Sequence, residues 1–319
     1  MQKHERDNMK LINYKEGSMN SHADPFIFEF DGKYYIYVTG RDGVHAFKSD
    51  TLLGEYEYCG IVFSAPDSRE YWAPSVISID GKCYMYVSFI KADETDVHMQ
   101  AMHVASADGP LGPFADVKPL IAPFSIDSHV VQNEAGLFIF YSVNDYEAHR
   151  AGTYIVVDKM KSPTEVIGNP VSVLRPSIDE EIFMKNRFRD GQHWHTLEGA
   201  FYFSEGNCHY LIYSGNCYQN EYYFLGYASA VTDEKDLTKI KFEKRPSDKE
   251  YAPLVSKNSF EAGTGHNSVI KVDGEYYCIY HGRDIPPDPR LKGDSRTARI
   301  CRLKLDGPML YAERFLDKL

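Results

Sequence analysis

The sequence predicts an all-β protein, a five-bladed β-propeller with four antiparallel strands per blade, formed by one domain over residues 1–319 with a lead-in at 1–20. Two observations predict this fold. A polar residue and a glycine precede a short aromatic and β-branched run five times, and helical periodicity is almost absent. No low-complexity linker separates the repeats, so one domain is favoured over two. A two-sheet β-sandwich is the alternative, but it would not repeat one hairpin signature.

Each repeat indicates a tight hairpin entering a strand. The first reads Asp31-Gly32 followed by Lys33 to Tyr37, and the last reads Asp273-Gly274 followed by Glu275 to Tyr280. Glycine supplies the positive φ that a two-residue turn requires. The five glycines stand at positions 32, 81, 136, 206 and 274. Such unequal spacing is typical of blades with loops of different length.

Composition narrows the classes of partner. The chain has 46 acidic against 35 basic residues and a net charge of -11, which disfavours binding to nucleic acid or anionic lipid. Its six cysteines are far apart without a C-x-x-C spacing, so we expect neither a zinc site nor a disulfide framework. No apolar run approaches the roughly 18 residues of a membrane span. The first ten residues are charged and no apolar segment follows, which predicts a cytoplasmic protein.

Five positions upstream of the glycines share one structural slot. The innermost strand of each blade starts near the propeller axis, so residues eight or nine positions before each glycine should converge on a central funnel. These residues are Asp24, Trp72, Asp127, Glu198 and His266. Three of the five are acidic, which is the composition that acid and base chemistry at one site requires.

A ring of carboxyl groups can hydrolyse a glycosidic bond. One protonated carboxyl donates to the leaving oxygen, and one ionised carboxylate activates a water on the opposite face of the sugar. Carboxyls on opposite blades leave room for that water, which predicts inversion of configuration. A third acid beside the donor would raise the pKa of the donor by like-charge repulsion.

Five segments then resemble, in order, the blade motifs of glycoside hydrolase family 43. They are Ala23-Asp24-Pro25, Tyr71-Trp72-Ala73-Pro74-Ser75, Ser125-Ile126-Asp127, Leu197-Glu198-Gly199-Ala200 and Gly263-Thr264-Gly265-His266-Asn267-Ser268-Val269. The resemblance covers about residues 20 to 310. It implies a five-bladed propeller that hydrolyses arabinose- and xylose-containing glycans with inversion. Two positions depart from the family pattern: Ala200 replaces a proline, and Ser128 follows Asp127 where proline is common.

The resemblance also implies a role for each slot. Asp24 matches the general base, Glu198 the general acid, and Asp127 the residue that orients the substrate and tunes the acid. His266 matches the position beneath the sugar, where a calcium ion or a water is bound in the family, so His266 is a candidate metal ligand. The resemblance implies no required cofactor.

Three further residues are candidates for substrate binding. Trp72 could form a wall under a sugar ring, although tryptophan is more often a core residue. Arg296 aligns loosely with an arginine of the family that contacts the sugar. His22 lies two residues before Asp24, so we expect it to face the same pocket.

The sequence therefore favours an exo-acting α-L-arabinofuranosidase or β-xylosidase that acts on oligosaccharides. An endo-acting arabinanase and a non-catalytic sugar-binding or scaffold propeller are the alternatives. A phosphorylase would need basic residues in the funnel, and the five slots hold none. Arabinose against xylose, exo against endo action, and the oligomeric state stay open at this level.

Overall fold

The computed structural model describes residues 10–314, in which the regular structure is almost entirely β. Residues 1–9 of the predicted lead-in, which carry most of the charged segment behind the expectation of a cytoplasmic location, lie outside the described residues. Two 3₁₀ turns, η1 (Val97–Met99) and η2 (Asp179–Glu181), are the helical elements of the described part. No helix in residues 10–314 is long and apolar enough to cross a membrane.

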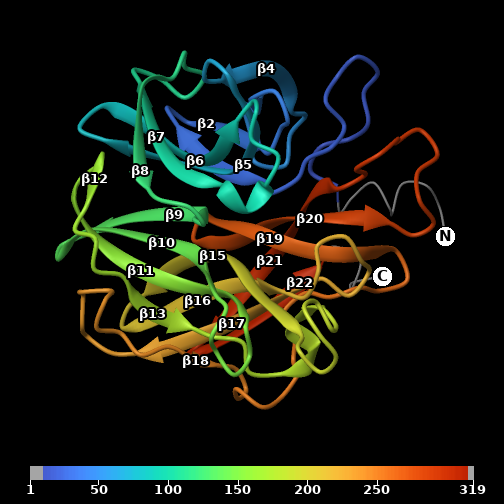
Figure 1. The fold of residues 1–319 in the computed structure, drawn as a ribbon. Coiled ribbons are helices and arrows are strands. Elements are labelled where there is room, and N and C mark those ends of the chain that lie inside the picture. Colours follow the sequence, from blue (N-terminus) through green and yellow to red (C-terminus); the bar gives the residue numbers. More distant parts are fainter. Residues whose placement is uncertain (1–9, 315–319) are drawn as a thin grey trace.

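Blades 1, 2 and 5 are separate four-stranded antiparallel sheets in chain order (Figure 1). Blade 1 consists of β1 (Phe26–Phe30), β2 (Lys33–Val38), β3 (Val44–Ser49) and β4 (Glu57–Phe63). Blade 2 consists of β5 (Ser68–Ile79), β6 (Lys82–Lys91), β7 (Ala101–Ala107) and β8 (Ala115–Ile121). Blade 5 consists of β19 (Glu261–Val272), β20 (Glu275–Asp284), β21 (Thr297–Asp306) and β22 (Met309–Arg314).

Blades 3 and 4 share one sheet, because β11 pairs in parallel with β15 at Gly152↔His195 and Thr153↔Thr196. Blade 3 consists of β9 (Ile126–Asn133), β10 (Gly136–Asp145) and β11 (Gly152–Ser162), with β12 (Glu165–Val166) and β13 (Val171–Leu174) together forming its outer strand. Blade 4 consists of β15 (Trp194–Glu205), β16 (Cys208–Gly215), β17 (Phe224–Val231) and the short β18 (Glu243–Lys244), and β14 (Ile182–Met184) pairs with β15. The predicted four-stranded blades are thus confirmed, with irregular outer strands in these two.

The hairpin turns follow the predicted chemistry. Asp31 and Gly32 have φ of 51° and 70°, as a type I′ turn requires, and Asp273 and Gly274 repeat this with 51° and 83°. In blade 3 the turn comes earlier, so that Gly136 is the first residue of β10.

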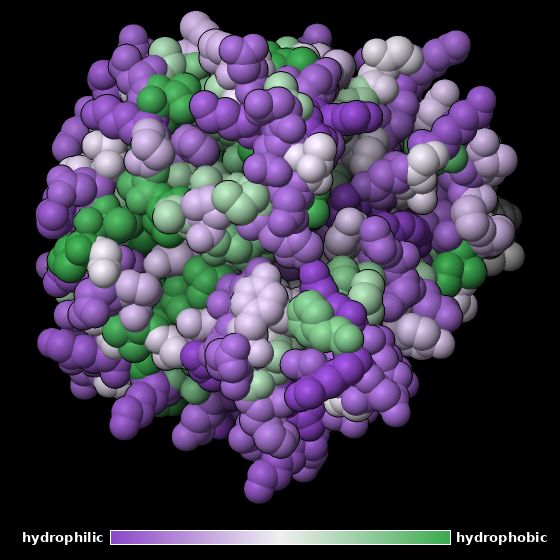
Figure 2. All heavy atoms as spheres, viewed as in Figure 1, coloured by the Kyte–Doolittle hydropathy of each residue, from purple (hydrophilic) through white to green (hydrophobic). Residues whose placement is uncertain are grey.

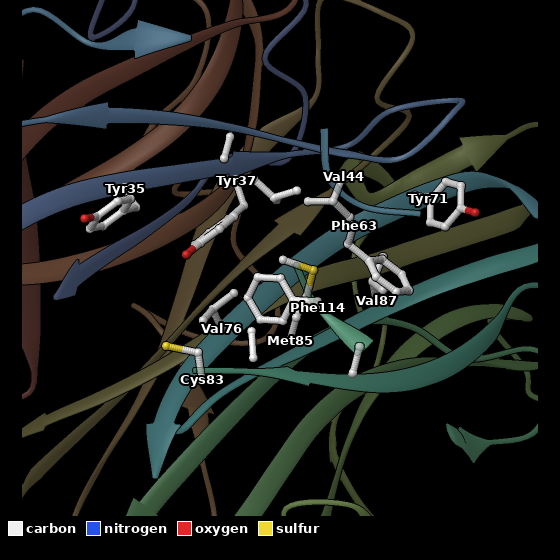
Figure 3. Packing of buried hydrophobic residues seen from close by; sticks show 14 of the residues in the cluster. Tyr35, Tyr37, Val44, Phe63, Tyr71, Val76, Cys83, Met85, Val87 and Phe114 are labelled. Carbon is white, nitrogen blue, oxygen red and sulfur yellow. The ribbon is translucent and has the colours of Figure 1, made fainter. Parts of the chain in front are cut away.

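The innermost strands close a ring around the axis. Each of β1, β5, β9, β15 and β19 contacts the next, and β19 contacts β1. The apolar core lies between neighbouring blades. In Figure 3, Tyr37 and Val44 of blade 1 meet Val76, Met85 and Phe114 of blade 2, and all five are buried. Burial of both sheet faces against their neighbours is what holds the blades in a ring.

The outer surface is mostly polar, in keeping with the acidic composition. Hydrophilic residues cover most of the face in Figure 2, and apolar residues gather at the left, at the end of the molecule where β12 lies. Ile167, which follows β12, and Val171, the first residue of β13, are 49% and 39% exposed.

A buried ionic cluster ties the lead-in to blade 5. Glu261, at the start of β19, is fully buried and lies 3.4 Å from Arg299 Nη1 and 3.2 Å from Arg314 Nη1. Arg299 also contacts Asp284 at 2.6 Å, and Lys10 of the lead-in contacts the same carboxylate at 2.5 Å. Removal of the Glu261 carboxylate would leave the positive charges of Arg299 and Arg314 without one of their negatively charged partners.

We expect Glu261→Ala to lower the free energy of unfolding by about 3–5 kcal/mol, because it breaks a buried ion pair. The matched control is Glu243→Ala, which removes a 75% exposed partner of Arg245 and should cost less than about 1 kcal/mol. Urea unfolding followed by circular dichroism measures both. Equal losses in the two variants would contradict a structural role for the cluster.

Candidate active site

A cavity of about 370 Å³ opens on the propeller axis, where the innermost strands begin. Six of the seven predicted site residues line it: Asp24, Trp72, Asp127, Glu198, His266 and Arg296. The three carboxyl groups, which are remote in the sequence, therefore share one enclosed space.

A repeated backbone irregularity delivers these side chains. All five inner segments contain a residue at positive φ at or next to the predicted position: Asp24 (55°), Ala73 (45°), Asp127 (60°), Gly199 (61°) and His266 (47°). The strand register shifts around the last four of these positions. Such bulges turn a side chain out of the regular alternation. Glu70 (57°) in β5 and Gly263 (59°) in β19 are second left-handed residues in their strands. Left-handed backbone at non-glycine residues costs on the order of 1 kcal/mol or more each and is concentrated at functional sites.

Gly199 explains why glycine follows the acid in the fourth blade. Besides its positive φ, a Cβ here would lie 3.1 Å from His266 Nδ1. A larger residue would push His266 away from Asp24, whose Oδ1 lies 3.4 Å from the same nitrogen.

Asp24 is held in its ionised form. Thr39 Oγ1 donates to its Oδ2 at 2.6 Å, and Arg296 Nη1 lies 3.4 Å from its Oδ1. Burial alone would raise the pKa of Asp24, but His266 and Arg296 together hold this pKa well below its usual range. The pKa of His266 is itself lowered by burial, so Arg296 is the full positive charge beside Asp24 at neutral pH.

Arg296 is fixed by a second carboxylate. Its Nε and Nη2 donate to Asp294 Oδ2 at 2.8 and 2.6 Å, and its guanidinium carbon lies 4.9 Å from the centre of the Tyr218 ring. The two carboxylates raise the pKa of Arg296 despite its burial. A planar, permanently charged group clamped on both sides has little freedom to leave Asp24.

Glu198 and Asp127 have the opposite electrostatics. Burial is the largest cause that raises the pKa of Glu198, to about 7; Asp24 adds to the rise, and a 2.8 Å hydrogen bond from Tyr223 Oη opposes it. Burial, Glu198 and Asp24 raise the pKa of Asp127 well above its usual range, although Gly199 N donates to its Oδ2 at 3.1 Å. This pair therefore loses its protons at higher pH than Asp24, which is the ionised group of the three at neutral pH. Burial, more than the expected repulsion between like charges, protonates the donor.

Trp72 and His266 lie in the cavity wall, as their positions eight or nine residues before a hairpin glycine predict. Trp72 is half-buried in the cavity wall, and its Nε1 donates to Glu70 Oε2 at 3.4 Å. His266 lies beside Asp24 and stacks at 6.4 Å on His281, whose Nδ1 accepts from the backbone of Asp24.

The expectation that His22 faces the pocket is wrong. His22 is buried outside the cavity: its Nε2 donates to Met19 O at 3.1 Å, its Nδ1 accepts from Ala298 N at 3.3 Å, and its ring packs edge-on against Phe47. Alternate residues share a face only in a regular strand. The chain at 22–24 is irregular, and the left-handed Asp24 turns its own side chain away from the side of His22.

The residues around His266 do not fit a protein-bound calcium ion. Calcium prefers six to eight oxygen ligands. Asp24 is the carboxylate beside His266, and it is already paired with Thr39 and Arg296. No group of three or more His, Cys, Asp or Glu side chains in residues 10–314 could hold a metal ion.

Several cavity residues escaped the sequence argument. Thr39 bridges two blades, because it also accepts from Ala73 N at 2.8 Å, and Arg41 and Asp294 line the cavity from loops. Tyr223, which is not among the predicted site residues, lines the cavity and donates to Glu198. The signal for Tyr223 lies in Gly265, where a Cβ would fall 1.9 Å from the Tyr223 ring.

One ionised and one protonated carboxyl group, held in the funnel of a propeller, define a glycoside hydrolase. The chain belongs to one family of this class: the pattern described as "Glycosyl hydrolases family 43" matches residues 18–307. Members of this family invert the anomeric configuration, so this protein is an inverting glycoside hydrolase.

Individual relatives and a solved structure agree with the assignment to this family. The chain is 25% identical over 336 aligned positions to a "Xylosidase/arabinosidase" of Bacteroides ovatus, with 89% of this chain and 92% of that protein covered. It is 27% identical to an "Extracellular exo-alpha-(1->5)-L-arabinofuranosidase" of Streptomyces avermitilis, with 88% of this chain and 59% of that protein covered. A crystal structure of a thermostable family-43 glycoside hydrolase superposes with a TM-score of 0.75 at 28% identity and covers 94% of this chain and 96% of its own.

We expect Glu198→Gln to stabilise the fold in a pH-dependent way. The folded pKa of about 7 exceeds the usual 4.5, so the wild type loses stability as pH rises from about 4.5 through 7, when the unfolded chain ionises more readily. The amide that replaces the carboxyl group cannot ionise, so relative to wild type the variant should gain about 3 kcal/mol between about pH 4 and pH 8.

Urea unfolding at both pH values measures this gain. Glu243→Gln, at an exposed position, is the control and should show almost no such gain. A Glu198→Gln variant with the same pH dependence as wild type would contradict a protonated Glu198.

Proposed function

We propose that the protein is an exo-acting glycosidase that releases arabinofuranose or xylose from oligosaccharides with inversion. The observation that carries the proposal is the pairing, in one cavity, of Asp24 with a lowered pKa and Glu198 with a pKa raised to about 7. The substrate class is supported by two relatives, which are named as a xylosidase/arabinosidase and an exo-arabinofuranosidase.

In this mechanism Asp24 is the general base. Its carboxylate accepts a proton from a water molecule, whose oxygen attacks the anomeric carbon of the bound sugar. Glu198 is the general acid and donates its proton to the glycosidic oxygen as the bond to the leaving group breaks. The water and the leaving group lie on opposite faces of the sugar, so the configuration inverts. After product release, proton exchange with solvent restores both groups.

The other cavity residues position these two groups. Asp127 accepts from Gly199 N and so fixes the strand segment that carries Glu198. Arg296 keeps Asp24 ionised and presents its guanidinium to the sugar hydroxyls. Trp72 offers a flat face to the sugar ring.

The shape of the cavity supports exo action. Met19 of the lead-in, Ser21 just after it and Asp294 of the β20–β21 loop contribute to its wall, so one side of the axis is covered by segments outside the blades. A volume of about 370 Å³ is at the small end of ligand pockets, which suits one terminal sugar and its immediate neighbour.

The cytoplasmic location expected from the sequence stays a prediction.

The decisive experiment is a substrate panel with NMR detection. Nitrophenyl α-L-arabinofuranoside, nitrophenyl β-D-xyloside, linear arabinan and the matching oligosaccharides are incubated with the protein, and the anomer formed first is observed. Release of single sugars of inverted configuration is expected. Products of intermediate length from arabinan would instead indicate endo action, and the absence of hydrolysis would contradict the proposal.

We expect Asp24→Asn and Glu198→Gln to lower kcat/KM on oligosaccharides about a hundredfold or more, because each removes one proton-transfer group. The two variants should differ on nitrophenyl substrates. Nitrophenolate leaves without full protonation, so Glu198→Gln should retain much more activity there than Asp24→Asn. Similar losses for Glu198→Gln on both substrate types would contradict the acid assignment.

We expect kcat/KM to fall about tenfold per pH unit above about pH 7, as Glu198 loses its proton. Tyr223→Phe removes the hydrogen bond that lowers the pKa of Glu198, so the midpoint of this fall should move to higher pH. Tyr56→Phe removes a buried hydroxyl bonded to Leu52 O at 3.1 Å, away from the cavity, and should leave the midpoint in place. An unshifted midpoint in Tyr223→Phe would contradict this control of Glu198.

A further inference from the structure

An aromatic cluster beside the cavity has no part in the mechanism above. We call it the aromatic ledge and define it as Tyr146, Phe188 and Trp194. The Trp194 ring is buried, 3% exposed, and lies 4.9 Å from the ring of Tyr146 and 5.9 Å from that of Phe188. Tyr146 and Phe188 are 49% and 52% exposed. Two half-exposed rings are thus supported on a third that forms their base.

A cation fixes the ledge in place. The guanidinium carbon of Arg187 lies 4.6 Å from the centre of the Trp194 ring and 5.5 Å from that of Phe188. Its Nη2 donates to His98 Nε2 at 2.7 Å, and the His98 ring lies 6.2 Å from that of Phe124. Loops of blades 2, 3 and 4 therefore meet at this point.

Strand direction places the ledge at the same end of the propeller as the cavity. Ile126, at the start of β9, lines the cavity, and Ser142 of β10 pairs with it, so β10 ends at this level and Tyr146 follows immediately. Trp194 is the first residue of β15, four residues before Glu198. At the rise of a strand these two residues are about 13 Å apart, which a short oligosaccharide can span.

The ledge is continuous with the cavity wall. Gln100, at the end of η1 and two residues from His98, donates from its Nε2 to Glu70 O at 2.9 Å, and Glu70 lines the cavity. Phe124 is two residues before Ile126, which also lines it. The surface from the cavity to Tyr146 and Phe188 is thus built by segments in direct contact.

We propose that the aromatic ledge binds the leaving-group part of a neutral oligosaccharide, namely the sugar units beyond the bond that is cleaved; this inference rests on the proposed function. Glu198 protonates the leaving oxygen, and the chain beyond that oxygen departs on the side of the strand that carries Glu198. Trp194 lies on that strand, whereas the lead-in and Asp294 cover another part of the wall. The exposed rings carry no charge, and flat aromatic faces suit the apolar faces of sugar rings.

The test compares substrates of different length. The readout is the ratio of kcat/KM on a longer oligosaccharide to kcat/KM on the nitrophenyl glycoside of the same sugar, which has no sugar in its leaving group. We expect Tyr146→Ala and Phe188→Ala each to lower this ratio about three- to tenfold, and the double variant to lower it further. The ratio for the disaccharide should change less than the ratio for longer chains.

The matched control is Tyr311→Ala. Tyr311 is 52% exposed, as Phe188 is, but lies on the outer strand β22 of blade 5. Its ratio should equal that of the wild type. Equal losses on both substrate types, or an unchanged ratio in the double variant, would overturn the assignment of the ledge while leaving the proposed function intact. A wild type that hydrolyses neither substrate would overturn the proposed function and this inference with it.

Discussion

The contact between Arg296 and Asp24 sets the electrostatics of the whole site. Three carboxyl groups line one buried cavity, and burial alone would protonate all of them. His266 and the Arg296 guanidinium, which lies 3.4 Å from Asp24 and is held by Asp294, lower the pKa of Asp24 and so select which of the three stays ionised. That ionised group then helps to keep the protons on the other two. The acid and base roles follow from the basic groups, which surround Asp24 but not the other two carboxyl groups to the same degree.

The backbone prepares this asymmetry. In each blade a left-handed residue near the start of the inner segment interrupts the alternation of side chains and turns a side chain toward the axis. A regular strand would send neighbouring side chains to the two faces of a blade, where the apolar contacts between blades require hydrophobic residues. The left-handed residues are local costs that the five interblade cores can sustain, and they give the propeller a polar funnel inside an apolar ring.

The hairpin repeat predicted the blades and most of the axial residues from sequence, because a tight turn requires glycine at a fixed position and this requirement is visible in the sequence. Counting back along a strand from Gly32 or Gly206 reached Asp24 and Glu198, since a strand has a fixed rise and the number of residues to the axis is nearly constant. The expectation for His22 had a different basis, the alternation of side chains along a strand, and it failed because residues 22–24 lie on a chain segment without regular alternation.

Residues that reach the cavity from loops could not be found in this way. Arg41, Asp294 and Tyr223 arrive there through tertiary contacts, which no spacing encodes. The sheet shared by blades 3 and 4 could not be predicted from the sequence either. The pairing of β11 with β15 joins segments about forty residues apart through a short stretch of backbone on each strand. Sequence therefore described the repeat, and packing decided where the repeats differ.

That shared sheet makes the five blades mechanically unequal. Among the described strands, β11 and β15 are the pair that joins different blades by a ladder, whereas the other blade junctions depend on side-chain packing and isolated bridges. Local opening follows the weaker junctions first. Asp127 and Glu198 are carried by the two joined blades, whereas Asp24 lies on blade 1, which shares no ladder with another blade among the described strands. A displacement between blades would therefore change the distance from Asp24 to the other two carboxyl groups, across which the attacking water must fit, more than the distance between Asp127 and Glu198.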